Sequence, residues 1–256
     1  MAQENEKEIQ QLKNRFRDLA DRSFSQGIYT FTGFLGLAEQ DLFHQMEKEL
    51  GYAGFALSGG CEGADRQMIR FGDQGLLGYE MPFPIVCIHI KPLIAKFADK
   101  LSHRDFLGAL MNLGIDRGTI GDIKVGEKEA YLFCVDSIAS FICENLGKVK
   151  HTHVNCSVTE NMAELPQEEP VFVNIQVQSL RIDAVLAKVY NMSREKSLDL
   201  FRAGKVYVNG RLCENNSRLL RPDETVNARG YGKFRLVGEP RETRKGKLTA
   251  EAAVYK

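Results

Sequence analysis

The chain has 256 residues, enough for two or three small domains that each bury a core. Hydrophobic residues make up 43% and charged residues 27%, which is ordinary for a soluble globular protein. No stretch approaches the ~20 apolar residues of a membrane-spanning helix, and the charged N-terminus lacks the apolar centre of a secretory signal. These features exclude the membrane and secretory classes, so we expect a cytoplasmic protein.

The net charge of zero hides an uneven distribution along the chain. From Ser179 onward there are 17 Lys and Arg residues against 9 Asp and Glu, whereas the preceding residues hold 17 against 25. A basic last third behind an acidic front suggests that only the last third contacts a polyanion. A chance division of solvated charges is the alternative.

The cysteines form no C-x-x-C pair, so neither a zinc knuckle nor a thioredoxin-type redox site is indicated. Several lie among apolar residues, where a free thiol behaves as a small buried hydrophobe. We expect a reducing compartment, no metal and no cofactor. The six positions are Cys61, Cys87, Cys134, Cys143, Cys156 and Cys213.

Residues 1–80 are expected to form a small N-terminal α/β unit. The apolar spacing over residues 3–25 predicts a helix, and a second helix is expected over 38–50, ended by Gly51. Strands are expected at 55–57 and 68–71. The intervening segment SGGCEGADR is interpreted as a tight turn rather than a phosphate cradle, because it lacks the Lys-Ser/Thr of a P-loop.

Residues 81–178 are expected to form a middle domain. The pattern predicts strands at 84–90, 120–125, 130–135 and 152–158, with helices at 102–113 and 136–146. This β-α-β-β-α-β order is that of a ferredoxin-like or RNA-recognition-type sheet. Residues 161–170 are expected to be a linker or an exposed loop, and 171–177 a strand that could still belong to this domain.

Residues 179–240 are expected to form a third domain of two short helices and a small sheet, followed by a basic tail over 241–256. The first helix ends at Asn191, and Ser193 caps a second helix that runs to Gly204. A hairpin follows with its turn at Asn209-Gly210, since both residues accept positive φ. The start of the second helix and the neighbouring cations are suited to gripping phosphates.

The C-terminal motifs resemble the S4 domain in order and spacing. This module is named after a ribosomal protein and recurs in pseudouridine synthases, some aminoacyl-tRNA synthetases and ribosome-associated factors. In that family the second helix and the following loop bind structured RNA. The motifs are Leu180-Arg181-Ile182-Asp183, Ser193-Arg194, Gly204-Lys205-Val206, Val208-Asn209-Gly210 and Pro222-Asp223.

The predicted RNA-binding set combines residues implied by this resemblance with nearby basic and aromatic residues. The resemblance implies Arg181, Ser193, Arg194, Lys196, Arg202, Lys205, Val206 and Asn209. The charge pattern and the tail after the S4 core add Arg211, Arg229, Tyr231 and Lys233.

Further segments resemble the YlmH-type S4 proteins of bacteria and plastids. They are 58–66, 101–110, 114–115, 120–123, 229–234 and 243–247. Two departures are Asp65, where that family more often has Glu, and the extension over Leu248–Lys256. The resemblance implies a ribosome-associated factor without enzymatic activity. It would bind ribosomal RNA or tRNA on the large subunit or on stalled peptidyl-tRNA complexes, as a monomer, in translation or ribosome quality control.

Two features of the middle domain have competing interpretations. His103-Arg104-Asp105 resembles a kinase catalytic loop, but position 110 is Leu where that loop needs Asn, so a capped helix start is favoured over a phosphate contact. His151 and His153 lie beside Lys148 and Lys150. Without a third ligand they do not indicate a metal site, and their basic face could touch RNA.

Two other classes of function remain as hypotheses. An RNA-modifying enzyme related to pseudouridine synthases is one. It is disfavoured because residues 30–160 contain no Arg-Leu-Asp motif and the S4-like segment is C-terminal. The other is a protein-interaction adaptor linked to cell division, with incidental RNA affinity. Pseudouridine assays and RNase-sensitive pull-downs would separate these alternatives.

Overall fold

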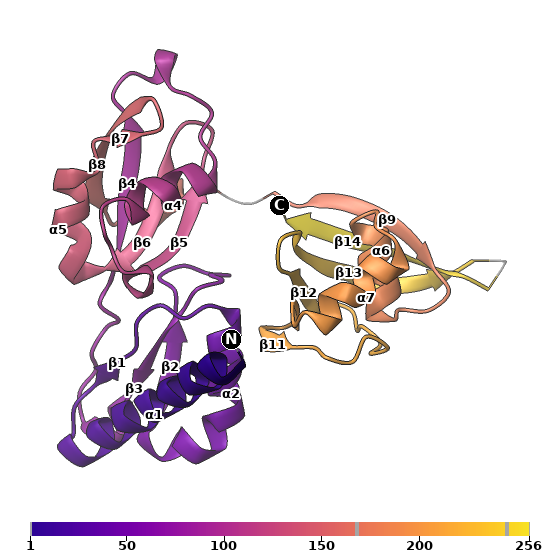
Figure 1. The fold of residues 1–256 in the computed structure, drawn as a ribbon, viewed down its shortest axis with the longest axis horizontal. Helices are drawn as coiled ribbons and strands as arrows, with labels where there is room; N and C mark the ends of the chain where they lie inside the picture. The colour runs from indigo at the N-terminus through magenta and orange to yellow at the C-terminus, as the bar shows by residue number, and fades with distance from the viewer. Residues whose placement is uncertain (1, 167–168, 244–245, 256) are drawn as a thin grey trace. The chain divides into compact units, whose positions relative to one another are not determined.

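The structure, a computed structural model, describes residues 2–166, 169–243 and 246–255. The chain divides into two compact units, Met1–Pro166 and Gln167–Lys256 (Figure 1). We call them the N-terminal and C-terminal units. Both combine helices with antiparallel sheets, which confirms the predicted mixture of α and β structure. The division falls within the predicted linker over 161–170.

The first part of the N-terminal unit is a three-stranded sheet against which two helices pack. The helices are α1 (Ala2–Gln26) and α2 (Leu37–Leu50), and the strands, in sheet order, are β1 (Thr30–Phe31), β3 (Met68–Phe71) and β2 (Phe55–Ser58). Phe16 of α1, Phe43 of α2 and Phe71 of β3 meet in one core cluster. The apolar stripe on the first helix is what directs it to this sheet.

The second part of the N-terminal unit is a five-stranded antiparallel sheet. Its strands, in sheet order, are β5 (Ile120–Val125), β6 (Ala130–Val135), β4 (Ile85–Pro92), β8 (Thr152–Thr159) and β7 (Lys148–Val149). The helices α4 (His103–Met111) and α5 (Asp136–Asn145) bury Phe106, Leu110 and Ile142 against it. The elements therefore follow the chain in the β-α-β-β-α-β order that the sequence pattern predicts, with β7 added at one edge.

The remaining elements of this unit are short. They are the helix α3 (Gln74–Leu77) and the 3₁₀ turns η1 (Gly51–Ala53), η2 (Ala95–Phe97), η3 (Arg117–Thr119) and η4 (Met162–Glu164).

Residues 58–66 join the two sheets of the N-terminal unit. The backbone N–H groups of Asp65 and Arg66 donate to the carboxylate of Asp122, at 2.7 and 3.1 Å. The Arg66 guanidinium donates to the carbonyl oxygens of Phe34, Arg117 and Ile120. This segment has a structural role, as the turn interpretation proposed, and its arginine is committed to backbone oxygens.

The C-terminal unit is a six-stranded antiparallel sheet with two helices, α6 (Ile182–Val189) and α7 (Arg194–Arg202), packed on one face (Figure 1). Leu186, Phe201, Phe234 and Val254 belong to the core cluster between helices and sheet. In sheet order the strands are β11 (Arg211–Leu212), β10 (Val206–Val208), β12 (Thr225–Ala228), β13 (Gly232–Glu242), β14 (Leu248–Tyr255) and β9 (Val171–Val177).

The structure corrects the predicted boundaries at two points. The strand at 171–177, placed with the middle domain over 81–178, pairs with β14 along its whole length and so belongs to the C-terminal sheet. Residues 248–255, expected within a basic tail, form β14. Ala250, Ala252 and Val254 of this strand alternate into the core, and this period of two indicates a strand despite the basic residues that precede it.

Candidate nucleic-acid interface

The start of the first C-terminal helix carries a buried carboxylate shared by two arginines. The side chain of Asp183 is 1% exposed. It accepts hydrogen bonds from Arg181 at 3.1 Å and from Arg194 at 3.0 and 3.2 Å. The Arg181 and Arg194 side chains are 36% and 60% exposed, so both remain partly accessible to solvent. One anion thus positions two cations and leaves an excess positive charge.

The electrostatics of Asp183 favour this arrangement. Burial opposes ionisation of the carboxyl group, but the hydrogen bonds from Arg181 and Arg194 outweigh it and hold its pKa below the ordinary value of 3.8. The buried hydroxyl of Ser197 donates to the Asp183 backbone oxygen at 2.9 Å. This bond ties α7 to α6, so the relative position of the two arginines is set by helix packing.

Arg181 and Arg194 line a groove of about 640 Å³ beside α6. Two further cations line this groove: Lys188 of α6, and Lys247, the residue just before β14. The described residues that line it include no Asp or Glu. The uncharged polar residues of the lining are Gln176, Gln178, Ser179 and Asn191. We call this the α6 groove. Four cations in a concave surface make it suited to a polyanion.

Sequence reasoning missed Lys188, Lys247 and the two glutamines. Lys188 follows Arg181 by seven residues, a spacing that puts both on one face of a helix, so a signal for it existed. Lys247 and Gln176 come together only because β14 pairs with β9, where Thr249 lies opposite Gln176. No local sequence pattern predicts the pairing of β14 with β9.

A second group of predicted residues lies where α7 runs into the sheet. The Arg229 backbone N–H donates to the Lys205 oxygen at 2.9 Å, so these two exposed cations are neighbours. Among the residues that the structure describes, neither side chain has a hydrogen-bond or ion-pair partner. Lys196 lies over the half-buried ring of Tyr231, 5.7 Å from its centre, which is cation–π geometry.

Three members of the predicted set have structural roles. Val206 is 0% exposed and packs in the core, so its side chain cannot contact RNA; this corrects its inclusion. Ser193 caps α7 by accepting the Lys196 N–H at 3.2 Å. Asn209 has a φ of 51° in the hairpin turn and accepts the Thr225 N–H at 2.9 Å.

The last three predicted residues lie apart from the groove. Arg202 forms an exposed ion pair with Asp199 at 2.8 Å, and Arg211 lies on the edge strand β11. Lys233 alternates with the buried Phe234, which faces the helices, so it lies on the opposite face of the sheet, over the ring of Tyr255. The predicted set is therefore not one continuous surface.

The protein therefore has an α+β fold, and its α6 groove is a cation-lined surface suited to binding a polyanion. Residues 80–163 match a family described as "Putative RNA-binding domain in YlmH". The chain is also 28% identical over 220 residues to "Ribosome-associated protein quality control protein P2" of Bacillus subtilis (strain 168), covering 84% of this chain and 83% of that protein. These matches confirm the resemblance to YlmH-type proteins.

Among solved structures, the chain is similar to "Cell division protein ylmH from Streptococcus pneumoniae". The two are 20% identical with a TM-score of 0.49, and the match covers 62% of this chain and 95% of that one. Within the described residues, no helix is long and apolar enough to cross a bilayer.

Proposed function

We propose that this chain is a non-catalytic, ribosome-associated RNA-binding factor whose C-terminal unit holds folded RNA by its sugar-phosphate backbone. The observation that carries the proposal is the pair Arg181 and Arg194, fixed by one buried carboxylate at the edge of the α6 groove. Structured RNA is recognised largely by shape and by backbone contacts, for which a fixed array of guanidinium and ammonium groups is suited.

The finer assignment follows the resemblance to S4 domains and the name of the bacterial relative. In this proposal the protein is a cytoplasmic monomer that binds ribosomal RNA on the large subunit, with tRNA as a second contact, and takes part in translation through quality control of stalled complexes. The order β5-β6-β4-β8 in the five-stranded sheet of the N-terminal unit supports a ferredoxin-like, RNA-recognition-type domain in that part of the chain.

The test reverses the two groove cations that do not pair with Asp183. The double variant Lys188→Glu/Lys247→Glu leaves the buried network intact, whereas reversing Arg194 would put a second carboxylate beside Asp183. We expect weaker cosedimentation with large ribosomal subunits. The slope of log K against log salt should be flatter by about 0.7–0.9 for each phosphate that the variant no longer neutralises.

The matched control is Arg15→Glu/Lys48→Glu, which changes the net charge equally on the exposed surfaces of α1 and α2. Its binding should equal that of the unaltered protein, and both variants should melt at the unaltered temperature. Equal affinity and slope for the groove variant and the control would refute the proposal. Formation of pseudouridine in RNA treated with the protein would refute its non-catalytic part.

A further inference from the structure

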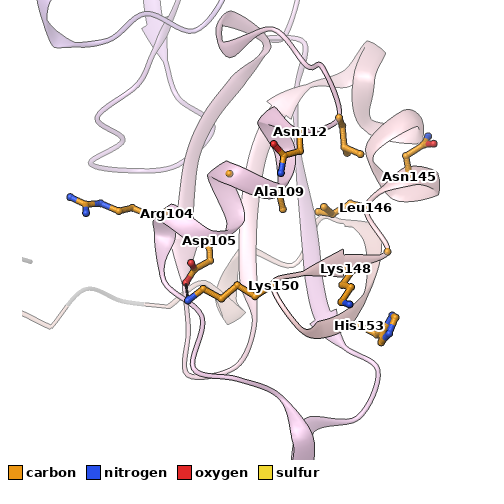
Figure 2. A pocket seen from close by; sticks show the side chains of 12 residues that line it. Arg104, Asp105, Ala109, Asn112, Asn145, Leu146, Lys148, Lys150 and His153 are labelled. Atoms are coloured by element: carbon orange, nitrogen blue, oxygen red, sulfur yellow. Dashed lines mark ion pairs between the residues drawn. The ribbon is translucent and has the colours of Figure 1, made fainter.

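A second cationic cleft lies in the N-terminal unit, between α4 and the β7–β8 hairpin. Its volume is about 780 Å³, and Figure 2 shows its lining. Arg104 and Asp105 come from the start of α4, while Lys148, Lys150 and His153 come from the hairpin. We call it the α4–β7 cleft. It lies within the residues that match the family model, which does not say where RNA would bind.

The cleft has more positive charge than its one lining carboxylate can neutralise. Lys150 pairs with Asp105 at 2.9 Å. The pKa of Asp105 is lowered to about 2 by the hydrogen bond from Lys150 and by those from Ser102, so this carboxylate is ionised at neutral pH. Arg104 and Lys148 then remain as uncompensated cations. Neither side chain makes a hydrogen bond or ion pair with any residue that the structure describes.

The geometry of the β7–β8 hairpin fixes where Lys148, Lys150 and His153 lie. Lys148 and His153 are directly opposite each other in the β7–β8 register, so their exposed side chains are neighbours on one face. Lys150 adopts a φ of 51° in the turn, and its ion pair anchors the hairpin to α4. The buried Val149 and Thr152 alternate to the other side. The basic face is therefore held by the fold.

The arrangement suits a nucleic-acid strand better than a single small anion. In Figure 2 the basic side chains are spread out instead of converging on one point: Arg104 extends outward from the start of α4, Lys150 lies beside Asp105, and Lys148 lies near His153. Lysine and arginine side chains spread over a surface match the successive phosphates of a backbone. The exposed amide of Asn112 borders the same cleft and offers both a donor and acceptor to ribose hydroxyls.

We propose that the α4–β7 cleft is a second RNA-backbone site, separate from the α6 groove. The proposal rests on the proposed function only in taking RNA as the ligand. Arg104, Lys148 and Lys150 hold successive phosphates, and Asp105 positions Lys150 without contacting RNA. An acidic protein segment is the competing occupant, and the test distinguishes it.

The experiment uses the full chain and purified large-subunit ribosomal RNA. The double variant Arg104→Glu/Lys148→Glu is compared with the control Arg15→Glu/Lys48→Glu, and the neutral variant Arg104→Gln/Lys148→Gln guards against misfolding caused by charge reversal. The salt slope of binding is measured for each, and ultraviolet crosslinks are mapped by mass spectrometry. We expect crosslinks in peptides that contain residues 104–112 and 148–153. The slope should flatten by roughly 1.5 units in both cleft variants, because two phosphates are no longer neutralised.

Three outcomes separate this inference from the proposed function. Flatter slopes for both cleft variants, with crosslinks in the cleft, support the inference. An unchanged slope without crosslinks in the cleft, while Lys188→Glu/Lys247→Glu still flattens the slope, overturns the cleft alone and leaves the C-terminal site in place. If neither the cleft nor the groove variants alter binding, both proposals fail, and an acidic protein becomes the better partner for the cleft.

Discussion

Asp183 determines how much positive charge its two arginines can offer to a ligand. Its carboxylate is buried, and ionised because two guanidinium groups donate to it. Arg181 and Arg194 are consequently held in place, with part of their hydrogen-bonding capacity already used. Because the two side chains are already ordered, less conformational entropy is lost when RNA binds to them. Arg202, whose partner Asp199 is exposed, has no comparable constraint.

We predict that Asp183→Asn lowers the stability of the protein by about 1–3 kcal/mol at neutral pH, because the buried carboxylate loses its charge-assisted hydrogen bonds from two partly exposed arginines. The pKa of Asp183 is depressed in the folded protein. The stabilisation that the ionised carboxylate gives is therefore complete at pH values above the pKa of the unfolded chain, near 3.8. It is lost as the pH falls through the pKa of the folded protein. Urea unfolding followed by circular dichroism from neutral pH into strong acid should show the difference between the two proteins narrowing below about pH 4. A difference that stays constant with pH would contradict this role.

At the scale of elements, glycines permit the close approach of the two sheets in the N-terminal unit. A side chain at Gly33 would put its Cβ 2.8 Å from the Gly118 oxygen, and one at Gly121 would put it 2.6 Å from the Phe34 ring. Phe34 packs in a cluster with Tyr131 and Phe133 of β6, on the sheet face opposite α4 and α5. This shared core explains why residues 1–166 form one compact unit.

We predict opposite effects for two glycine-to-alanine changes in this unit. Gly121→Ala should destabilise by roughly 1–3 kcal/mol, because its methyl group overlaps the buried Phe34 ring. Gly108→Ala, on an exposed face of α4 with nothing within 4 Å, should stabilise by up to about 1 kcal/mol through helix propensity. Thermal melting of both variants measures the difference. A Gly121→Ala protein as stable as the unaltered chain would show that the contact between the two sheets can relax to admit the methyl group.

At the scale of the whole molecule, the uneven charge along the sequence does not by itself mark the RNA-facing part. The C-terminal unit holds the α6 groove, yet the acidic front also contains a locally cationic cleft. Net charge controls long-range attraction, whereas local clusters determine contacts within about one Debye length, roughly 8–10 Å in physiological salt. An acidic unit can therefore contribute an RNA contact of its own.

We predict that the effects of the two sites add when one RNA contacts both. Combining Lys188→Glu/Lys247→Glu with Arg104→Glu/Lys148→Glu should flatten the salt slope by the sum of the two separate changes, about 3 units in all. Filter binding of large-subunit RNA across a salt series measures this sum. A combined change no larger than that of the groove variant would mean that the cleft does not contact the same RNA.

Most helices and strands, the cap at Ser193, the turn at Asn209-Gly210 and the resemblance to YlmH-type proteins can be predicted from local sequence patterns. These depend on periodicity, side-chain capping and positive φ, which act within a few residues. Three features become clear only in the folded chain: β14 pairs with β9 in the C-terminal sheet, Val206 is buried, and Lys247 lines the same groove as Arg181 and Arg194. Those outcomes depend on contacts between segments far apart in the chain, and no local pattern specifies such pairings.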